Sequence, residues 1–234
     1  MSNEGISVEE LTKKRTPSEL LNWVDRKREQ LASTEERERA LILHKELAKQ
    51  FEEEVYPLAL FGQRKYGDTD QILMQPIIGN QSYDAVVTDL RSKPASESYI
   101  EITQSHEGEN DYFRRLVLGH KGFVFGHSRA IKKGTRQNRQ VSIPPQVVTP
   151  SDVARDELGR IVDAARRKEA KDYPANTSLI IVFEDDWFFR QAVDDTRLDT
   201  FVKENILKLD LRFSTLYLIG WHNVFREFSL AKRT

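Results

Sequence analysis

Two stretches of the sequence decide the fold: Tyr83-Asp84-Ala85-Val86-Val87-Thr88-Asp89 and Tyr99-Ile100-Glu101-Ile102-Thr103-Gln104. Both are rich in β-branched and aromatic residues, and a polar segment with Ser, Lys and Pro separates them, so they predict the two strands of a hairpin. Side chains alternate along a strand, which places Asp84 with Thr88 on one face and Glu101 with Thr103 on one face. If the strands pair, Asp84 and Glu101 can converge on one patch of the sheet.

An acidic pair among valines and isoleucines is costly unless it is hydrogen-bonded, protonated or bound to a metal ion. The chain has no cysteine, and no pair of histidines lies near these acids. A site of oxygen ligands alone suits Mg²⁺ or Mn²⁺ better than Zn²⁺. The alternative is that one or both carboxylates lie at strand ends in water.

Length and composition set modest limits on the fold and on partners. The 234 residues suffice for one large α/β domain or two small ones, and 38% hydrophobic residues suffice for a core. With Lys+Arg 36 against Asp+Glu 37, the formal charge is -1, so a nucleic-acid surface must be a local patch. The absence of cysteine excludes disulfides, thiolate metal sites and thiol nucleophiles. The N-terminus carries no apolar run of the kind found in signal peptides or membrane spans, so we expect a soluble, cytoplasmic protein with no membrane partner.

Residues 1–33 are expected to form an N-terminal helical arm, and residues 34–234 an α/β domain. Thr16-Pro17-Ser18-Glu19 has the N-cap, first-turn proline and capping-box glutamate of a helix start. A narrow apolar stripe follows it, made of Leu20, Leu21, Val24 and Leu31. We expect this stripe to pack on the main domain or on a partner, such as a second copy of the chain in a homodimer.

A second helix is expected to start at Ser33, with Glu36 completing a capping box, and to end between residues 57 and 62. Glu52, Glu53 and Glu54 lie late in this helix. Adjacent residues of a helix point in different directions, so at most one or two of the three face inward, and a solvated acidic end is the alternative. Because acids at a helix C-terminus oppose the macrodipole, one of them is a candidate for a site.

The remainder predicts helices at 111–121 and 149–171 and buried strands at 178–183 and 214–221, besides an edge strand at 71–78. Segments 123–126 and 141–143 read as the arms of an extended hairpin. Five cations with no acid among them lie between these arms: Arg129, Lys132, Lys133, Arg136 and Arg139. Clustered charge of this kind predicts contact with a phosphate backbone, and a solvated mobile loop is the alternative.

With Asp84 on the second strand and Glu101 on the third, the element order resembles the PD-(D/E)XK nuclease superfamily. The resemblance covers about residues 35 to 221. It implies a restriction-endonuclease-like fold, a mixed sheet of about five strands flanked by helices. It also implies that Asp84 and Glu101 bind Mg²⁺ or Mn²⁺, with Glu54, or next Glu53, assisting from the first helix. The metal would activate a water for attack on a phosphodiester bond.

The sequence departs from the motif of that superfamily at Thr103, where the motif has a lysine. Gln104 lies on the opposite face of an ideal strand and could substitute only if the strand twists or bulges. A positive charge could instead come from Arg114, Arg115 or Lys121, or from the basic loop. The predicted catalytic set is therefore Asp84, Glu101, Thr103, Gln104 and Glu54. The alternative function is an inactive nuclease-like module that binds nucleic acid or a protein partner through the 129–139 loop and the arm.

Overall fold

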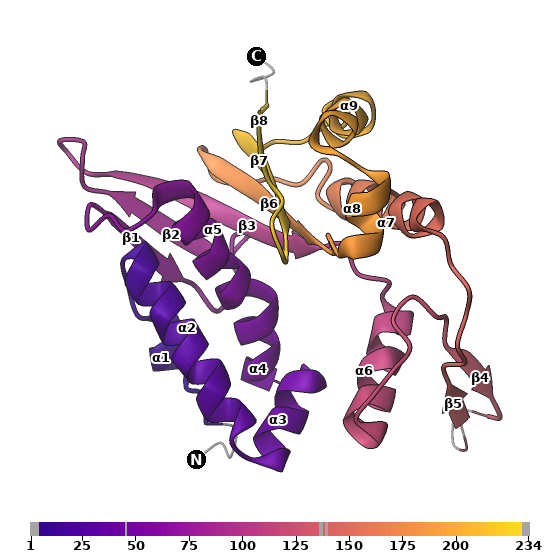
Figure 1. Ribbon diagram of the computed structural model, residues 1–234. Helices are drawn as coiled ribbons and strands as arrows, with labels where there is room; N and C mark the ends of the chain where they lie inside the picture. Colours follow the sequence, from indigo (N-terminus) through magenta and orange to yellow (C-terminus); the bar gives the residue numbers. More distant parts are fainter. Residues whose placement is uncertain (1–4, 45, 136–137, 139, 231–234) are drawn as a thin grey trace.

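The computed structural model describes residues 5–44, 46–135, 138 and 140–230 and shows a mixed six-stranded sheet with helices on both faces (Figure 1). The strand order is β1-β2-β3-β6-β7-β8. The strands are β1 (Ile72–Pro76), β2 (Ala85–Asp89), β3 (Ser96–Gln104), β6 (Thr177–Phe183), β7 (Thr215–Gly220) and β8 (Phe225–Ser229). The pairs β3–β6 and β6–β7 are parallel and the other pairs are antiparallel. The expected α/β class with a mixed sheet is confirmed, with six strands in place of about five.

The central strand β6 is buried on both faces, as its nearly continuous apolar sequence predicts. Its Ile180 and Val182 face the first core cluster, whereas Leu179, Ile181 and Phe183 face the second. The first cluster contains residues of the N-terminal helices, and the second contains residues of the C-terminal helices. These helices are α1 (Val8–Thr12), α2 (Pro17–Ala32) and α5 (Tyr56–Tyr66), then α7 (Pro150–Arg166), α8 (Trp187–Ala192) and α9 (Asp195–Asn205). The sheet is therefore the middle of three layers.

The N-terminal arm is packed into the first core cluster. The expected capping box at Thr16 is present, with both the Thr16 and the Glu19 side chains bonded to the backbone. Leu20, Val24 and Leu31 are almost fully buried against the sheet and α5. The backbone of Arg15 also exchanges hydrogen bonds with Met74 of β1. The apolar stripe is thus satisfied within the chain, and a homodimer through the arm stays a prediction.

The second helix differs from its expected course. It begins at Glu35 with Thr34 as N-cap and no side-chain cap, while the Ser33 hydroxyl donates to the Gln30 carbonyl. The helix is interrupted at His44, whose φ of 48° is incompatible with a right-handed helix. The chain then continues as α3 (Glu35–Ile42), α4 (Glu46–Gln50), the π-helix η1 (Phe51–Val55) and α5 to Tyr66. Helical structure therefore passes through Pro57 instead of ending there.

Three further expectations are corrected. The hairpin consists of β4 (Ile131–Lys133) and β5 (Gln140–Ser142), and residues 123–126 form no strand. Helix α6 (Glu109–Lys121) begins two residues early, and α7 ends at Arg166, five residues before the expected end. The edge strand β8 was not anticipated, because only Phe228 in it is buried. In the part of the chain that the structure describes, no helix has the length and apolarity needed to cross a membrane.

Candidate functional site

Asp84 directly precedes β2, and Glu101 lies in the neighbouring antiparallel strand β3. The charge of Glu101 raises the pKa of Asp84, so the two carboxylates are close in space. The Asp84 N–H donates to the Ile100 carbonyl over 2.7 Å, and its carboxylate accepts the Ile102 N–H over 2.6 Å. Glu101 is buried, with 8% of its surface exposed. The two carboxylates are thus neighbours, as the sequence predicts, and their role as metal ligands stays a prediction.

Lys168 supplies a positive charge at this pair, and no sequence pattern indicated it. It lies in the turn after α7, and its ammonium group donates to the Glu101 carboxylate. The Lys168 charge also lowers the pKa of Asp84, although burial and the charge of Glu101 raise it by more. A lysine is therefore present beside Glu101, although Thr103 occupies the position at which the motif has one. No pattern in the sequence indicates that Glu101 and Lys168, 67 positions apart, are in contact.

The cations proposed for this role from the sequence have other contacts. Arg114 donates to Glu107, to Asp111 and to the Ser128 carbonyl. No hydrogen bond or ion pair joins either Arg114 or Arg115 to Asp84 or Glu101 within the described residues. Gln104, as its place on an ideal strand predicts, faces away from Glu101 and donates to the Glu53 carbonyl over 3.2 Å.

Glu54 is the member of the acidic triplet that acts on Asp84 and Glu101. Glu52 is paired with Arg28 at 3.3 Å, and Glu53 with the His44 ring at 2.8 Å. All three lie in the π-helix η1, a conformation that is frequent at functional sites. Pro57 has no N–H to donate to the Glu53 carbonyl, and the Gln104 amide occupies that acceptor instead. This bond joins η1 to the end of β3, next to the acidic pair.

The electrostatics of the site are those of crowded carboxylates. Burial, followed by the charges of Asp84 and Glu53, raises the pKa of Glu54 to about 8. Burial and the charge of Glu101 raise the pKa of Asp84 to about 7, although the Ile102 N–H and Lys168 oppose that rise. Burial, followed by the charges of Glu101 and Asp84, raises the pKa of the Tyr173 phenol, so Tyr173 lies near the pair. A divalent cation would relieve this repulsion, so the oxygen ligands present fit Mg²⁺ or Mn²⁺.

A second acidic cluster lies at the β7–β8 turn. Glu184, Asp185 and His222 each place one ligand atom within 4.8 Å of the others, a spacing that Glu54, Asp84 and Glu101 do not reach together. Asp185 is fully buried, however, and its carboxylate accepts the backbone N–H groups of His222, Asn223 and Val224. Its lone pairs are therefore used to hold the turn.

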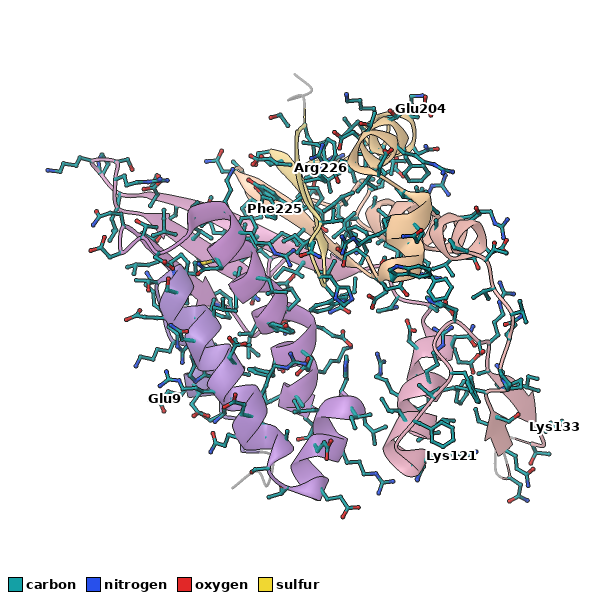
Figure 2. The ribbon with its side chains drawn as sticks, in the orientation of Figure 1. Glu9, Lys121, Lys133, Glu204, Phe225 and Arg226 are labelled. Atoms are coloured by element: carbon teal, nitrogen blue, oxygen red, sulfur yellow. The ribbon has the colours of Figure 1, made fainter. Side chains whose placement is uncertain are left out.

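The basic segment is only partly described. Arg136 and Arg139 lie outside the described residues, so their predicted phosphate contacts stay predictions. Lys132 contacts Glu109 of α6 at 2.6 Å, and Arg129 approaches Asp156 of α7 at 3.9 Å. The acids that balance these cations thus come from other elements. Figure 2 shows Lys133 on the outer side of the hairpin, where its strand is exposed.

Comparison with known proteins identifies no relative. No protein-family model, no curated protein and no solved structure matches the chain. The resemblance to the nuclease superfamily therefore rests on strand order and on the residues of the site.

Proposed function

We propose that the protein is a metal-dependent nuclease with a restriction-endonuclease-like fold, which hydrolyses phosphodiester bonds with Mg²⁺ or Mn²⁺ held by Asp84 and Glu101. The observation that carries the proposal is the Lys168 ammonium group on the Glu101 carboxylate, beside Asp84 on the same patch of sheet. Two neighbouring carboxylates with a lysine bound to one of them provide both a cation site and a charge that can stabilise an anionic transition state.

The arrangement of the strands supports the proposal at the level of fold. Three antiparallel strands, β1, β2 and β3, are followed by a helical crossover to β6, which is parallel to β3. Asp84 directly precedes β2 and Glu101 lies in the second half of β3, close to the arrangement that the resemblance to PD-(D/E)XK nucleases implies. Glu54 reaches the pair from the helix that precedes the sheet, which is also the expectation for that superfamily.

A bound divalent ion would supply an activated water and neutralise charge on the scissile phosphate. Lys168, already positioned by Glu101, donates hydrogen bonds toward an oxygen in its vicinity and stabilises negative charge there. With a pKa of about 8, Glu54 holds a proton at neutral pH until positive charge enters the site. It then becomes a carboxylate that can orient a water molecule by accepting its hydrogen bond.

The first test is cleavage of single-stranded and duplex DNA and RNA with Mg²⁺, Mn²⁺ or EDTA. We expect cleavage only with the metals, and a loss of at least about 1000-fold in Asp84→Asn and Glu101→Gln, since such a ligand contributes several kcal/mol. Cleavage that persists in EDTA or in Asp84→Asn would refute the assignment. Metal binding without cleavage in the wild-type protein would identify the inactive, nucleic-acid-binding module instead.

The role of Lys168 is tested separately with Lys168→Met, because methionine keeps the aliphatic length and removes the charge. We expect a fall of about 100-fold in turnover, the usual effect of removing one transition-state donor. Mn²⁺ affinity should be retained or increased, because a competing cation has left Glu101. Lys171→Met is the matched control, since Lys171 is an exposed lysine three residues further along. Equal activity of the two variants would exclude Lys168 from the mechanism.

A further inference from the structure

A polar pocket of about 340 Å³ lies at the carboxyl ends of β3 and β6. Its walls come from α6, from α7 and from the segment that follows α6. Gln104, which joins β3 to η1, is part of the wall, so the pocket adjoins the candidate site. Figure 1 shows α6 and the β4–β5 hairpin extending from the sheet on the side of α7 and α8.

The guanidinium of Arg115 lines this pocket without a hydrogen bond or an ion pair among the described residues, and its Nε is buried. Arg114 and Arg160 also line the pocket, but they are bound to acids of the wall. Those contacts pair Glu107, Asp111 and Glu157 with the two arginines, and Asp186 of the wall lies against His127. Among acids, the Arg115 charge acts on Glu53, whose pKa it helps to lower. A half-buried guanidinium without a hydrogen bond can recognise phosphate.

Exposed aromatic side chains surround the same pocket. Within the described residues, the strongly exposed aromatic side chains are Tyr112, Phe123, Phe125 and Trp187. Phe125 precedes Gly126 and Trp187 follows Asp186, and both Gly126 and Asp186 line the pocket. Phe125 is 43% exposed and Trp187 is 65% exposed, although large aromatic rings normally bury their faces.

The aromatic residues and the pocket are held together by His127. Its Nε2 lies 2.8 Å from Asp186, which caps α8, and its ring contacts Phe188. The segment that carries Phe125 is thereby attached to the helix that carries Trp187. The same segment continues into Arg129, Lys132 and Lys133, so exposed rings are followed by cations along one stretch.

We propose that this surface binds single-stranded nucleic acid, with a phosphate at Arg115 and bases against Phe125 and Trp187. Aromatic rings combined with cations are the recurrent means of binding single strands, because unpaired bases can stack on them. Bases inside a duplex are already stacked and cannot do so. The inference rests on the proposed function, since it takes nucleic acid as the substrate.

The test compares a single strand of about 12 nucleotides, the matching duplex and a nucleoside monophosphate, at fixed low salt in EDTA. We expect the single strand to bind at least about tenfold more tightly than the duplex and to quench Trp187 fluorescence. Trp187→Leu should remove most of that quenching, and Trp221→Phe is the matched control because Trp221 also lines the pocket, whereas Trp23 is packed against Phe51. A monophosphate that binds as tightly as the single strand would overturn the inference in favour of a free-nucleotide pocket.

Variants then separate stacking from charge. We expect Trp187→Leu, Phe125→Leu and Arg115→Gln each to weaken single-strand binding by about 5- to 100-fold and to leave duplex binding within about twofold. Trp187→Tyr should restore most of the binding. Leu90→Ala and Arg166→Gln are the controls: Leu90 lies at the β2–β3 turn, and Arg166 lines a separate hollow next to α9.

The outcomes distinguish this inference from the proposed function. Single-strand binding that depends on Trp187 and Arg115, without any metal-dependent cleavage, would support this inference and refute the nuclease. Metal-dependent cleavage in which these variants reduce single-strand and duplex turnover equally would leave the nuclease intact and overturn this inference. Unchanged binding in all three variants would also overturn it.

Discussion

The two acidic clusters of this molecule use the same side-chain chemistry for opposite purposes. At the β7–β8 turn, the Asp185 carboxylate accepts three backbone N–H groups over 2.7 to 2.8 Å and is completely buried. In the sheet, the Asp84 carboxylate accepts the Ile102 N–H and lies beside Glu101 and Glu54. The first cluster satisfies its charge within the chain, whereas in the second three carboxylates share the single ion-paired cation Lys168 among the described residues.

The surroundings of Asp185 are built to hold it. Arg64 donates to the carbonyls of Gly220, His222 and Val224, which fixes the same turn from the other side. A Cβ at Gly220 would meet the Asp185 carboxyl carbon at 2.1 Å, so this position requires glycine. A closely spaced set of ligand atoms is therefore weaker evidence for a metal than uncompensated repulsion between carboxylates.

The largest effect on stability is expected from Asp185→Ala. Loss of a buried carboxylate that accepts three N–H groups leaves those donors unsatisfied, and we expect a decrease of about 3–5 kcal/mol in the free energy of unfolding. Urea denaturation measures it. Asp194→Ala is the control, because Asp194 accepts one N–H as the N-cap of α9 and should cost about 1 kcal/mol. An equal cost for the two variants would refute the structural role of Asp185.

Asp84→Asn is expected to increase the free energy of unfolding of the metal-free protein, whereas Asp185→Ala decreases it. Asparagine can still accept the Ile102 N–H, and it removes a charge whose burial raises the pKa of Asp84 to about 7 from 3.8. The contribution of Asp84 to the free energy of unfolding of the wild type is greatest below pH 3.8, where the carboxyl is protonated in both states. This contribution is lost as the pH rises through about 7, the pKa in the folded protein. The gain in the variant should therefore be absent at low pH and reach about 2–4 kcal/mol at pH 8.

Thermal unfolding in EDTA across this pH range checks that prediction. Asp89→Asn is the control on the same strand, because its contact with Arg91 lowers the pKa of Asp89 to about 2. Asp89→Asn should lose stability above pH 4, where Asp84→Asn gains it. A destabilised Asp84→Asn at pH 8 would show that the acidic pair is balanced without a metal ion.

The smallest effect is expected on metal affinity when residues of the acidic cluster at the β7–β8 turn are changed. Glu184→Gln and His222→Gln should leave Mn²⁺ affinity within about twofold, whereas Glu101→Gln should reduce it by about tenfold or more. Isothermal titration calorimetry distinguishes the two sites. If Glu184→Gln abolished binding and Glu101→Gln did not, the metal would belong to the turn.

Local patterns were sufficient for much of the sheet and for the acidic pair. The strands around Asp84 and Glu101 follow from β-branched composition, and their shared face follows from the alternation of side chains. The capping box at Thr16 forms as its sequence predicts. These features depend on residues close together in the chain.

Features that depend on long-range packing could not be read in this way. Lys168 reaches Glu101 only because α7 crosses the sheet and ends above β3. Phe123 and Phe125 have the composition of a strand but pack their rings against each other without a partner strand. Strand β8 has charged Arg226 and Glu227 at its centre, and their partners lie on α9 and on other elements. Its edge position therefore hides it from a hydrophobicity pattern.

The π-helical turn η1 makes the chain length between Gln50 and Tyr56 as important as its composition. A π-helix is in effect an α-helix with one residue inserted, and each residue of an α-helix turns the chain by about 100°. Deleting one of the five residues of η1 would let the helix close its ordinary hydrogen bonds and would leave α5 in place. The acidic side chains would then rotate relative to β3, and the electrostatic effect of Asp84 on Glu54 would change. A shorter, regular helix would thus fold but would move Glu54 away from its position near the site. The π-helical turn is therefore required for the position of Glu54.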